Sequence, residues 1–285
     1  MNIDELLHGS VDMHVHFAPD ALMEFRMDAV DTAELARQMG MKAIVLKAHT
    51  YPTASLASLA EKLVPEVRVF GSICLEYECG GLNPHALAAV AKLGNRVVWM
   101  PTHSSNNEIK GSAGISLNEE GFSILDSKNQ LEPEIDKILS LIKEYKMVLC
   151  SGHISPAETF ALVEAALSKG ISKIIITHPL TVEIAKQKFT LENLRQLGEM
   201  GAFIEHTYVG YLPNELRHDP KRLVETIRAV GAEHTIISSD LGQYWNLPPG
   251  EGMRMFIALL LQNGVTEHEV ELMAKVNPST LLDLD

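Results

Sequence analysis

Cysteines, long apolar runs and basic clusters are scarce in this chain, and each absence excludes a class of protein. The three cysteines, Cys74, Cys79 and Cys150, are odd in number and lack CxxC spacing, which is typical of reduced thiols in the cytoplasm. No apolar run approaches the roughly 18–20 residues that span a bilayer. The acidic start, residues 1–5, has no basic region followed by an apolar one, so we expect no secretory signal.

Charge excludes a second class of function. The chain carries 24 Lys and Arg against 37 Asp and Glu, a formal net charge of −13, and no window concentrates basic residues. Binding to a nucleic-acid backbone needs such a basic face. At 285 residues and 46% hydrophobic, the chain is instead expected to be an acidic, globular, cytoplasmic protein with a small-molecule substrate. The sequence leaves a homo-oligomer open.

Short apolar, β-branched runs alternate with helical patterns along the whole chain. Several runs are continuously apolar, as expected for parallel strands that are covered on both faces. Helix starts are marked by Asn83-Pro84 and by the capping box Ser155-Pro156-Ala157-Glu158. The predicted strands are Val11–Phe17, Ala43–His49, Arg68–Leu75, Val97–Thr102, Met147–Ile154, Ile174–Pro179, Phe203–Val209 and Thr235–Gly242.

Eight strand–helix units in a chain of 285 residues predict a (β/α)8 TIM barrel. A doubly wound sheet is the competing architecture, but no GxGxxG-like turn supports it. We therefore expect residues 1–285 to form a single barrel domain. The long segment 103–131 after the fourth strand, with alternating runs at 114–117 and 121–125, is interpreted as a β-ribbon or loop insertion over the barrel mouth.

The positions of the 12 histidines carry most of the functional argument. In a (β/α)8 barrel the carboxyl ends of the strands converge on the face where active sites form, and clustered imidazoles there can bind zinc or related metals. Far more histidines than chance would place follow these strand ends: His14, His16, His49, His103, His153, His178 and His206.

The first strand contributes the sharpest motif, the pair His14-Val15-His16. Residues two apart on a strand point to the same face, so both imidazoles can enter the barrel mouth together. His153 and His178 follow the fifth and sixth strands, and Asp240 follows the eighth. A carboxylate after an apolar strand is costly to bury unless it is paired or bound to a metal, although Asp240 could also cap a helix.

Together these five residues resemble the ligand pattern of the amidohydrolase superfamily, a group of metal-dependent barrels. The resemblance spans nearly the whole chain. It implies that His14, His16, His153 and Asp240 bind a divalent metal, most readily zinc and alternatively manganese. It also implies that His178 binds a second metal or orients and polarises the substrate, and that Asp240 moves the proton of an attacking water.

The chain departs from the superfamily at the fourth strand, where binuclear members carry a bridging carboxylated lysine or a glutamate. Here that strand ends in Met100-Pro101-Thr102, followed by His103. One metal is therefore favoured over two, although Lys47 or Glu76 could bridge a second ion. Deaminase-type members carry a glutamate just beyond the fifth-strand histidine, and its absence argues against nucleoside deamination.

Further polar side chains are candidates for contact with the substrate. Lys47 could bind a substrate carboxylate, take part in catalysis or be carbamylated, or it could simply extend to solvent at a strand end. The remaining substrate-binding candidates are His49, Glu76, His103 and His206, of which His206 shares its strand with Glu205.

Water activation by the metal predicts hydrolysis of an amide, a lactone or a related C–N or C–O bond. In this interpretation Asp240 accepts the proton and His178 polarises the carbonyl. Two alternatives stay open: a mononuclear decarboxylase of the same superfamily, and a metal-binding barrel without catalysis.

Overall fold

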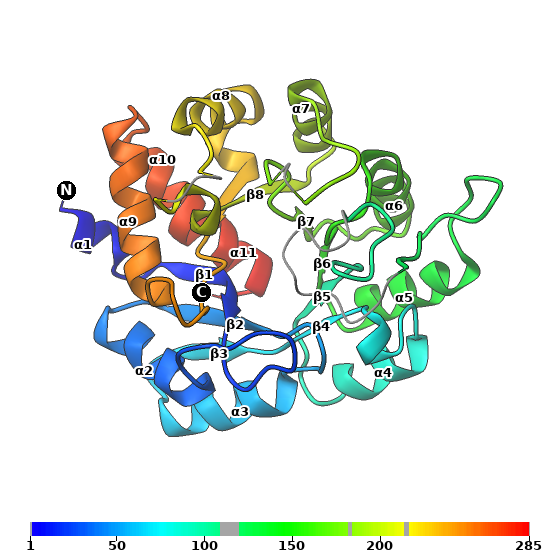
Figure 1. Cartoon of the computed structure of the whole chain (residues 1–285), viewed down its shortest axis with the longest axis horizontal. Helices are drawn as coiled ribbons and strands as arrows, with labels where there is room; N and C mark the ends of the chain where they lie inside the picture. Colours follow the sequence, from blue (N-terminus) through cyan, green and yellow to red (C-terminus); the bar gives the residue numbers. More distant parts are fainter. Residues whose placement is uncertain (1, 109–119, 182–183, 214–216, 285) are drawn as a thin grey trace.

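A computed structural model describes residues 2–108, 120–181, 184–213 and 217–284. Parallel strands alternate with helices along the chain, and the helices surround the strands in chain order (Figure 1). The predicted (β/α)8 architecture is confirmed. The strands are β1 (Val11–His16), β2 (Ala43–Lys47), β3 (Arg68–Phe70), β4 (Ser72–Cys74), β5 (Val97–Trp99), β6 (Val148–Cys150), β7 (Ile174–Ile176), β8 (Phe203–Thr207) and β9 (Thr235–Ser238).

The predicted third strand is divided into β3 and β4 at Gly71. A Cβ atom at Gly71 would lie 2.3 Å from the Cα of Ala54, so the backbone approaches the start of the preceding helix too closely for any side chain. The sheet is divided at the same point: β1, β2 and β3 form one sheet, and β4 to β9 form another, with parallel pairing throughout.

Backbone contacts bring the first strand beside the last. The amide of Asp240 donates to the carbonyl of His14 over 2.9 Å, and the amide of His16 donates to the carbonyl of Leu241 over 2.9 Å. At the other junction β2 packs beside β4. The two sheets therefore adjoin at both edges, and the carboxyl ends of β1 and β9 become neighbours.

The helices begin largely where the sequence predicts. Asn83 and Ser155 are N-caps, and Ser155 closes a full capping box with Glu158. The first two helices have no counterpart among the predicted ones. The helices are α1 (Ile3–Leu7), α2 (Ala29–Gln38), α3 (Ala54–Leu63), α4 (Pro84–Ala91), α5 (Pro133–Glu144), α6 (Pro156–Ser168), α7 (Leu191–Glu199), α8 (Pro220–Val230), α9 (Pro249–Gln262), α10 (Glu267–Glu271) and α11 (Asn277–Leu282).

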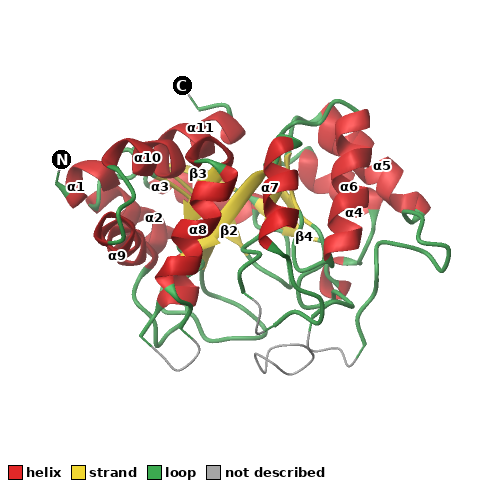
Figure 2. Ribbon diagram, turned by 90° about the horizontal axis from the view of Figure 1, so that it is seen from above, coloured by secondary structure: helices red, strands yellow, loops and turns green. Residues whose placement is uncertain are grey.

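Among the described residues, no helix combines the length and the apolar character needed to cross a membrane. Long loops extend from one side of the barrel, opposite the carboxyl terminus (Figure 2). In the insertion, residues 121–125 form isolated bridges, such as Phe122 with Ser105, in place of a regular strand. The alternating run predicted at 114–117 lies outside the described residues.

Candidate metal centre

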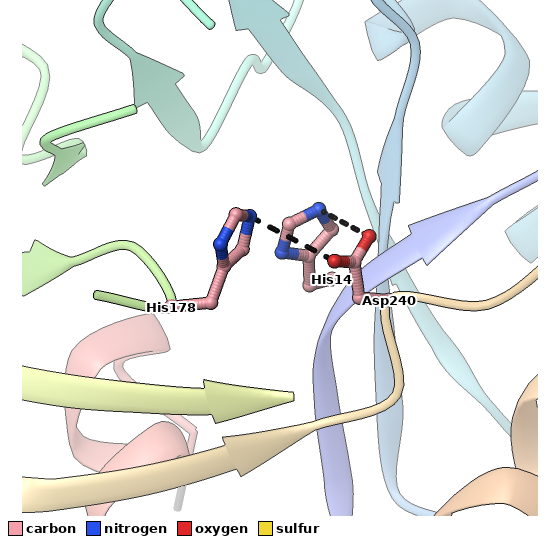
Figure 3. Close-up of side chains that lie close together, drawn as sticks. All are labelled: His14, His178 and Asp240. Atoms are coloured by element: carbon pink, nitrogen blue, oxygen red, sulfur yellow. Dashed lines mark ion pairs between the residues drawn. The ribbon is translucent and has the colours of Figure 1, made fainter. Parts of the chain in front are cut away.

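Asp240 lies at the centre of a cluster of imidazoles, and β1 supplies two of them. Oδ1 of Asp240 is 3.1 Å from Nε2 of His14 and 3.1 Å from Nε2 of His16. His178 approaches the other side of the carboxylate, with its Nε2 3.7 Å from Oδ2 (Figure 3). The sequence-predicted histidines of strands one and six therefore meet the predicted carboxylate of the last strand.

His153 joins this cluster through His178. Its Nε2 lies 3.3 Å from Nε2 of His178. Both histidines follow strands that end earlier than the sequence predicts, at Cys150 and Ile176. The turn before His153 requires Gly152, which has a φ of 59° and leaves no room for a Cβ, because Met100 O would lie 2.2 Å from it. The position of His153 therefore depends on the close approach of the backbone at Gly152 to the backbone at Met100.

The backbone itself is strained at two of these ligand positions. Asp240 has a φ of 55° and His178 a φ of 22°, in the left-handed region that non-glycine residues rarely occupy. Such conformations cost free energy and persist where the surrounding structure holds them. Here Asp12 contributes, because its Oδ1 accepts hydrogen bonds from the amides of His14 and Ser239.

The spacing of these donor atoms fits a single small divalent ion. Two ligands that each lie about 2.0–2.1 Å from one ion are separated by about 2.9–3.4 Å. The three distances of 3.1, 3.1 and 3.3 Å fall within that interval. The ligand atoms of His14, His178 and Asp240 all lie within 4.8 Å of one another. Nitrogen and carboxylate donors in this number are typical of zinc or manganese sites.

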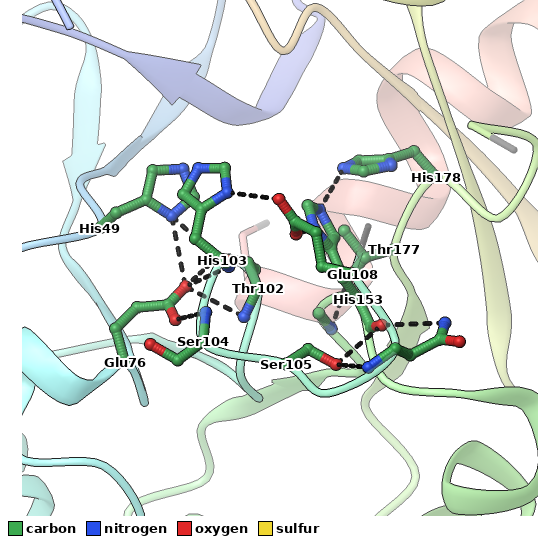
Figure 4. A network of polar contacts seen from close by, with 12 residues as sticks. His49, Glu76, Thr102, His103, Ser104, Ser105, Glu108, His153, Thr177 and His178 are labelled. Carbon is green, nitrogen blue, oxygen red and sulfur yellow. Dashed lines mark hydrogen bonds and ion pairs between the residues drawn. The ribbon is translucent and has the colours of Figure 1, made fainter. Parts of the chain in front are cut away.

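A second group, His103, Glu108 and His153, has a different geometry. Glu108 Oε2 lies 2.5 Å from Nδ1 of His153, and its Oε1 lies 2.8 Å from Nδ1 of His103 (Figure 4). These distances are those of hydrogen bonds and are too short for two ligands of one ion. Glu108 therefore accepts an Nδ1–H from each imidazole. The Nε2 lone pair of His153 then faces His178, as metal ligation requires.

Glu205 orients His14 in the same way. Its Oε2 lies 3.3 Å from Nδ1 of His14, which leaves Nε2 of that ring directed at Asp240. His206, a predicted substrate-binding residue, is also buried but is not among the residues that line the central cavity. Successive residues of a strand point to opposite faces, so β8 presents Glu205 rather than His206.

Lys47 and His49, two further predicted contacts, do reach the cavity. Nζ of Lys47 lies 3.0 Å from Nε2 of His14 and 5.3 Å from the centre of the Trp99 ring. The ring of His49 packs against that of His103, with centroids 4.1 Å apart. Nδ1 of His49 is 2.8 Å from the hydroxyl oxygen of Thr102.

Glu76 supports the site from behind instead of lining the cavity. Its Oε1 accepts hydrogen bonds from the amides of Thr102 and His103, over 2.9 and 3.1 Å, and from the Thr102 hydroxyl. Its Oε2 accepts from the amide of Ser104 over 2.7 Å. This buried carboxylate thereby fixes the first residues of the insertion, including His103, next to β5.

A cavity of about 210 Å³ opens over the imidazoles. Its polar lining includes Lys47, Glu108 and Asp240, and its apolar wall consists of Met23, Phe25, Ile184 and Val209. Glu108 is the residue that sequence reasoning missed most clearly. It comes from the insertion, and only the length of that loop hinted that it serves the site.

Burial sets the protonation of these groups. It lowers the pKa of His14 and His16 below the ordinary histidine value, and that of His178 to about 3. Burial alone would raise the pKa of Asp240, yet the facing imidazoles hold it well below its usual range. The same balance lowers the pKa of Glu108, where His153 and His103 outweigh burial. At neutral pH the imidazoles of His14, His16 and His178 are therefore neutral, and the Asp240 carboxylate is charged.

A family profile matches residues 9–205, most of the chain. The chain belongs to the family of unknown function DUF6282. Comparison with curated protein sequences finds no match.

Solved structures show which fold this DUF6282 member shares. An amidohydrolase from Pseudomonas aeruginosa is 11% identical and has a TM-score of 0.66 over 99% of this chain and 98% of that one. A probable dipeptidase from the same organism is 12% identical, with a TM-score of 0.69 over 98% and 96%. A 2,6-dihydroxybenzoate decarboxylase from Rhizobium is 12% identical, with a TM-score of 0.56 over 97% and 99%. The (β/α)8 fold predicted from the sequence is thus shared with these three structures.

Proposed function

We propose that this chain is a metal-dependent hydrolase that cleaves an amide, lactone or related bond of a small molecule. One divalent ion, zinc or alternatively manganese, would be held by His14, His16, His153 and Asp240, and His178 would then orient and polarise the substrate. The observation that carries the proposal is the Asp240 carboxylate, whose two oxygens face three neutral imidazoles. The free thiols of Cys74, Cys79 and Cys150 support a cytoplasmic location.

When bound, the ion would supply Lewis acidity, which polarises a carbonyl group and makes water a stronger nucleophile at neutral pH. Asp240 accepts the proton of the attacking water, because the facing imidazoles keep its carboxylate ionised. It then transfers that proton to the leaving group. Glu205 and Glu108 keep the Nε2 atoms of His14 and His153 directed inward throughout.

The experiment compares wild type with Asp240→Asn on a panel of nitrophenyl esters, lactones and anilides, after loading with zinc or manganese. We expect metal-dependent turnover that falls about 10²–10⁴-fold in the variant, the range for losing a proton-transfer group. Asp28→Asn is the matched control, since asparagine also serves as an N-cap where Asp28 begins α2.

The same panel tests the two alternatives. Aromatic carboxylic acids are added, and release of carbon dioxide is measured. Release of carbon dioxide without hydrolysis of any ester, lactone or anilide would show that the protein is a decarboxylase and not a hydrolase. Absence of turnover across the whole panel, with the metal bound, would favour a binding protein.

A further inference from the structure

Lys47 is a buried cation beside the metal ligands. It ends β2, and only 1% of its surface is exposed to solvent. Its side chain lines the cavity, with Nζ 3.0 Å from Nε2 of His14. Among the described residues, no carboxylate forms an ion pair with Lys47. Two carboxylates that line the same cavity are engaged elsewhere, because Asp240 faces three imidazoles and Glu108 bonds to two.

The acceptor that Lys47 uses is the same atom that a metal needs. A neutral imidazole has a single lone pair, and Glu205 keeps that of His14 on Nε2. The lone pair can accept a hydrogen bond from Lys47 or bind an ion, but not both. When a metal ion binds Nε2 of His14, the buried ammonium group of Lys47 therefore loses that acceptor. The ion also places a second positive charge near this ammonium group. A buried charge in that position requires a new partner.

We propose that this partner is the carboxylate of the substrate, so that Lys47 anchors substrates that are small, singly charged carboxylic acids with an apolar body. The inference rests on the proposed function and narrows its substrate class. A lone ammonium is a point charge suited to a monoanion, whereas phosphate recognition usually draws on several cationic donors. The apolar wall of Met23, Phe25, Ile184 and Val209 accommodates the rest of the molecule within about 210 Å³.

Calorimetry with benzoate and benzamide separates charge from shape, because the two probes have nearly the same size and differ in charge. Each is titrated into zinc-loaded and metal-free forms of wild type, Lys47→Gln and Lys62→Gln. The last variant removes the same charge from an exposed position of α3. Zinc content is measured first, so that failure of the metal site is recognised separately. Lys47→Met serves as a second variant if Lys47→Gln does not fold.

We expect zinc-loaded wild type to bind benzoate about tenfold more tightly than zinc-loaded Lys47→Gln, a difference of about 1.4 kcal/mol. Benzamide should bind both alike, and Lys62→Gln should match wild type. In the metal-free form the effect of Lys47→Gln should shrink, because His14 still accepts from Lys47. Equal benzoate affinity in zinc-loaded wild type and Lys47→Gln, including no binding by either, would overturn the proposal while leaving the metal site intact.

Discussion

Glu108 Oε2 lies 2.5 Å from Nδ1 of His153, although the two residues belong to different loops. The insertion reinforces this contact through the backbone of His153, whose carbonyl accepts from the Asn107 amide group over 3.2 Å and the Ser105 hydroxyl over 3.1 Å. The insertion therefore orients His153, one of the proposed metal ligands.

Replacing Glu108 with alanine should weaken zinc binding about 10–100-fold, the usual effect of removing a carboxylate that orients a histidine ligand. The reason is that the His153 ring loses the acceptor that keeps its proton on Nδ1. Competition with a chromophoric chelator measures the affinity, and nitrogen NMR of the histidine rings reports the tautomer directly. Glu120→Ala is the control, because Glu120 is exposed in the same insertion. Unchanged affinity and tautomer in Glu108→Ala would contradict this role.

Replacing Glu76 with alanine should destabilise the fold by about 2–4 kcal/mol, because the amides of residues 102–104 lose their shared acceptor in a buried place. Glu76→Gln should be destabilised less, since the side-chain amide oxygen of glutamine can still accept hydrogen bonds from these amides. Urea unfolding measures both variants against Glu66→Ala, which removes an exposed carboxylate. A Glu76→Ala protein as stable as the control would show that the insertion is anchored elsewhere.

His206 should make the protein sensitive to acid. Burial lowers its pKa to about 3, whereas an ordinary histidine titrates near 6.5. Between these pH values the unfolded chain binds a proton that the folded chain does not. The free energy of unfolding therefore falls as the pH decreases through this window, by about 1.4 kcal/mol per pH unit for this group.

Between pH 7 and pH 4, the free energy of unfolding should thus fall less steeply with decreasing pH in His206→Gln than in wild type. His85→Gln, which replaces an exposed histidine of α4, should follow wild type. Identical slopes in all three proteins would show that His206 does not titrate with folding.

The fold and the clustering of His14, His16 and Asp240 can be predicted from sequence because both depend on local pattern. Apolar runs marked the strands, and strand periodicity placed His14 and His16 on one face. The strand ends were predicted too long, since the positive φ of residues such as Asp240 is imposed by neighbouring segments that no local pattern contains.

The supporting carboxylates were harder to predict. Glu205 could have been found by applying strand parity to β8, where it alternates with His206. Glu108 could not, because its place depends on how a long insertion folds back onto His153, a contact between residues 45 positions apart. Glu76 is a predicted substrate-binding residue whose carboxylate oxygens accept hydrogen bonds from backbone amides of the insertion, and no local pattern indicates these partners.

Elemental analysis of the purified protein tests the central claim most directly. Wild type, purified without chelators, should contain about one equivalent of zinc or manganese per chain. A His14→Ala/His16→Ala variant should contain almost none while retaining its circular dichroism spectrum. Wild type that holds no metal, and takes up none from excess zinc or manganese, would contradict the account.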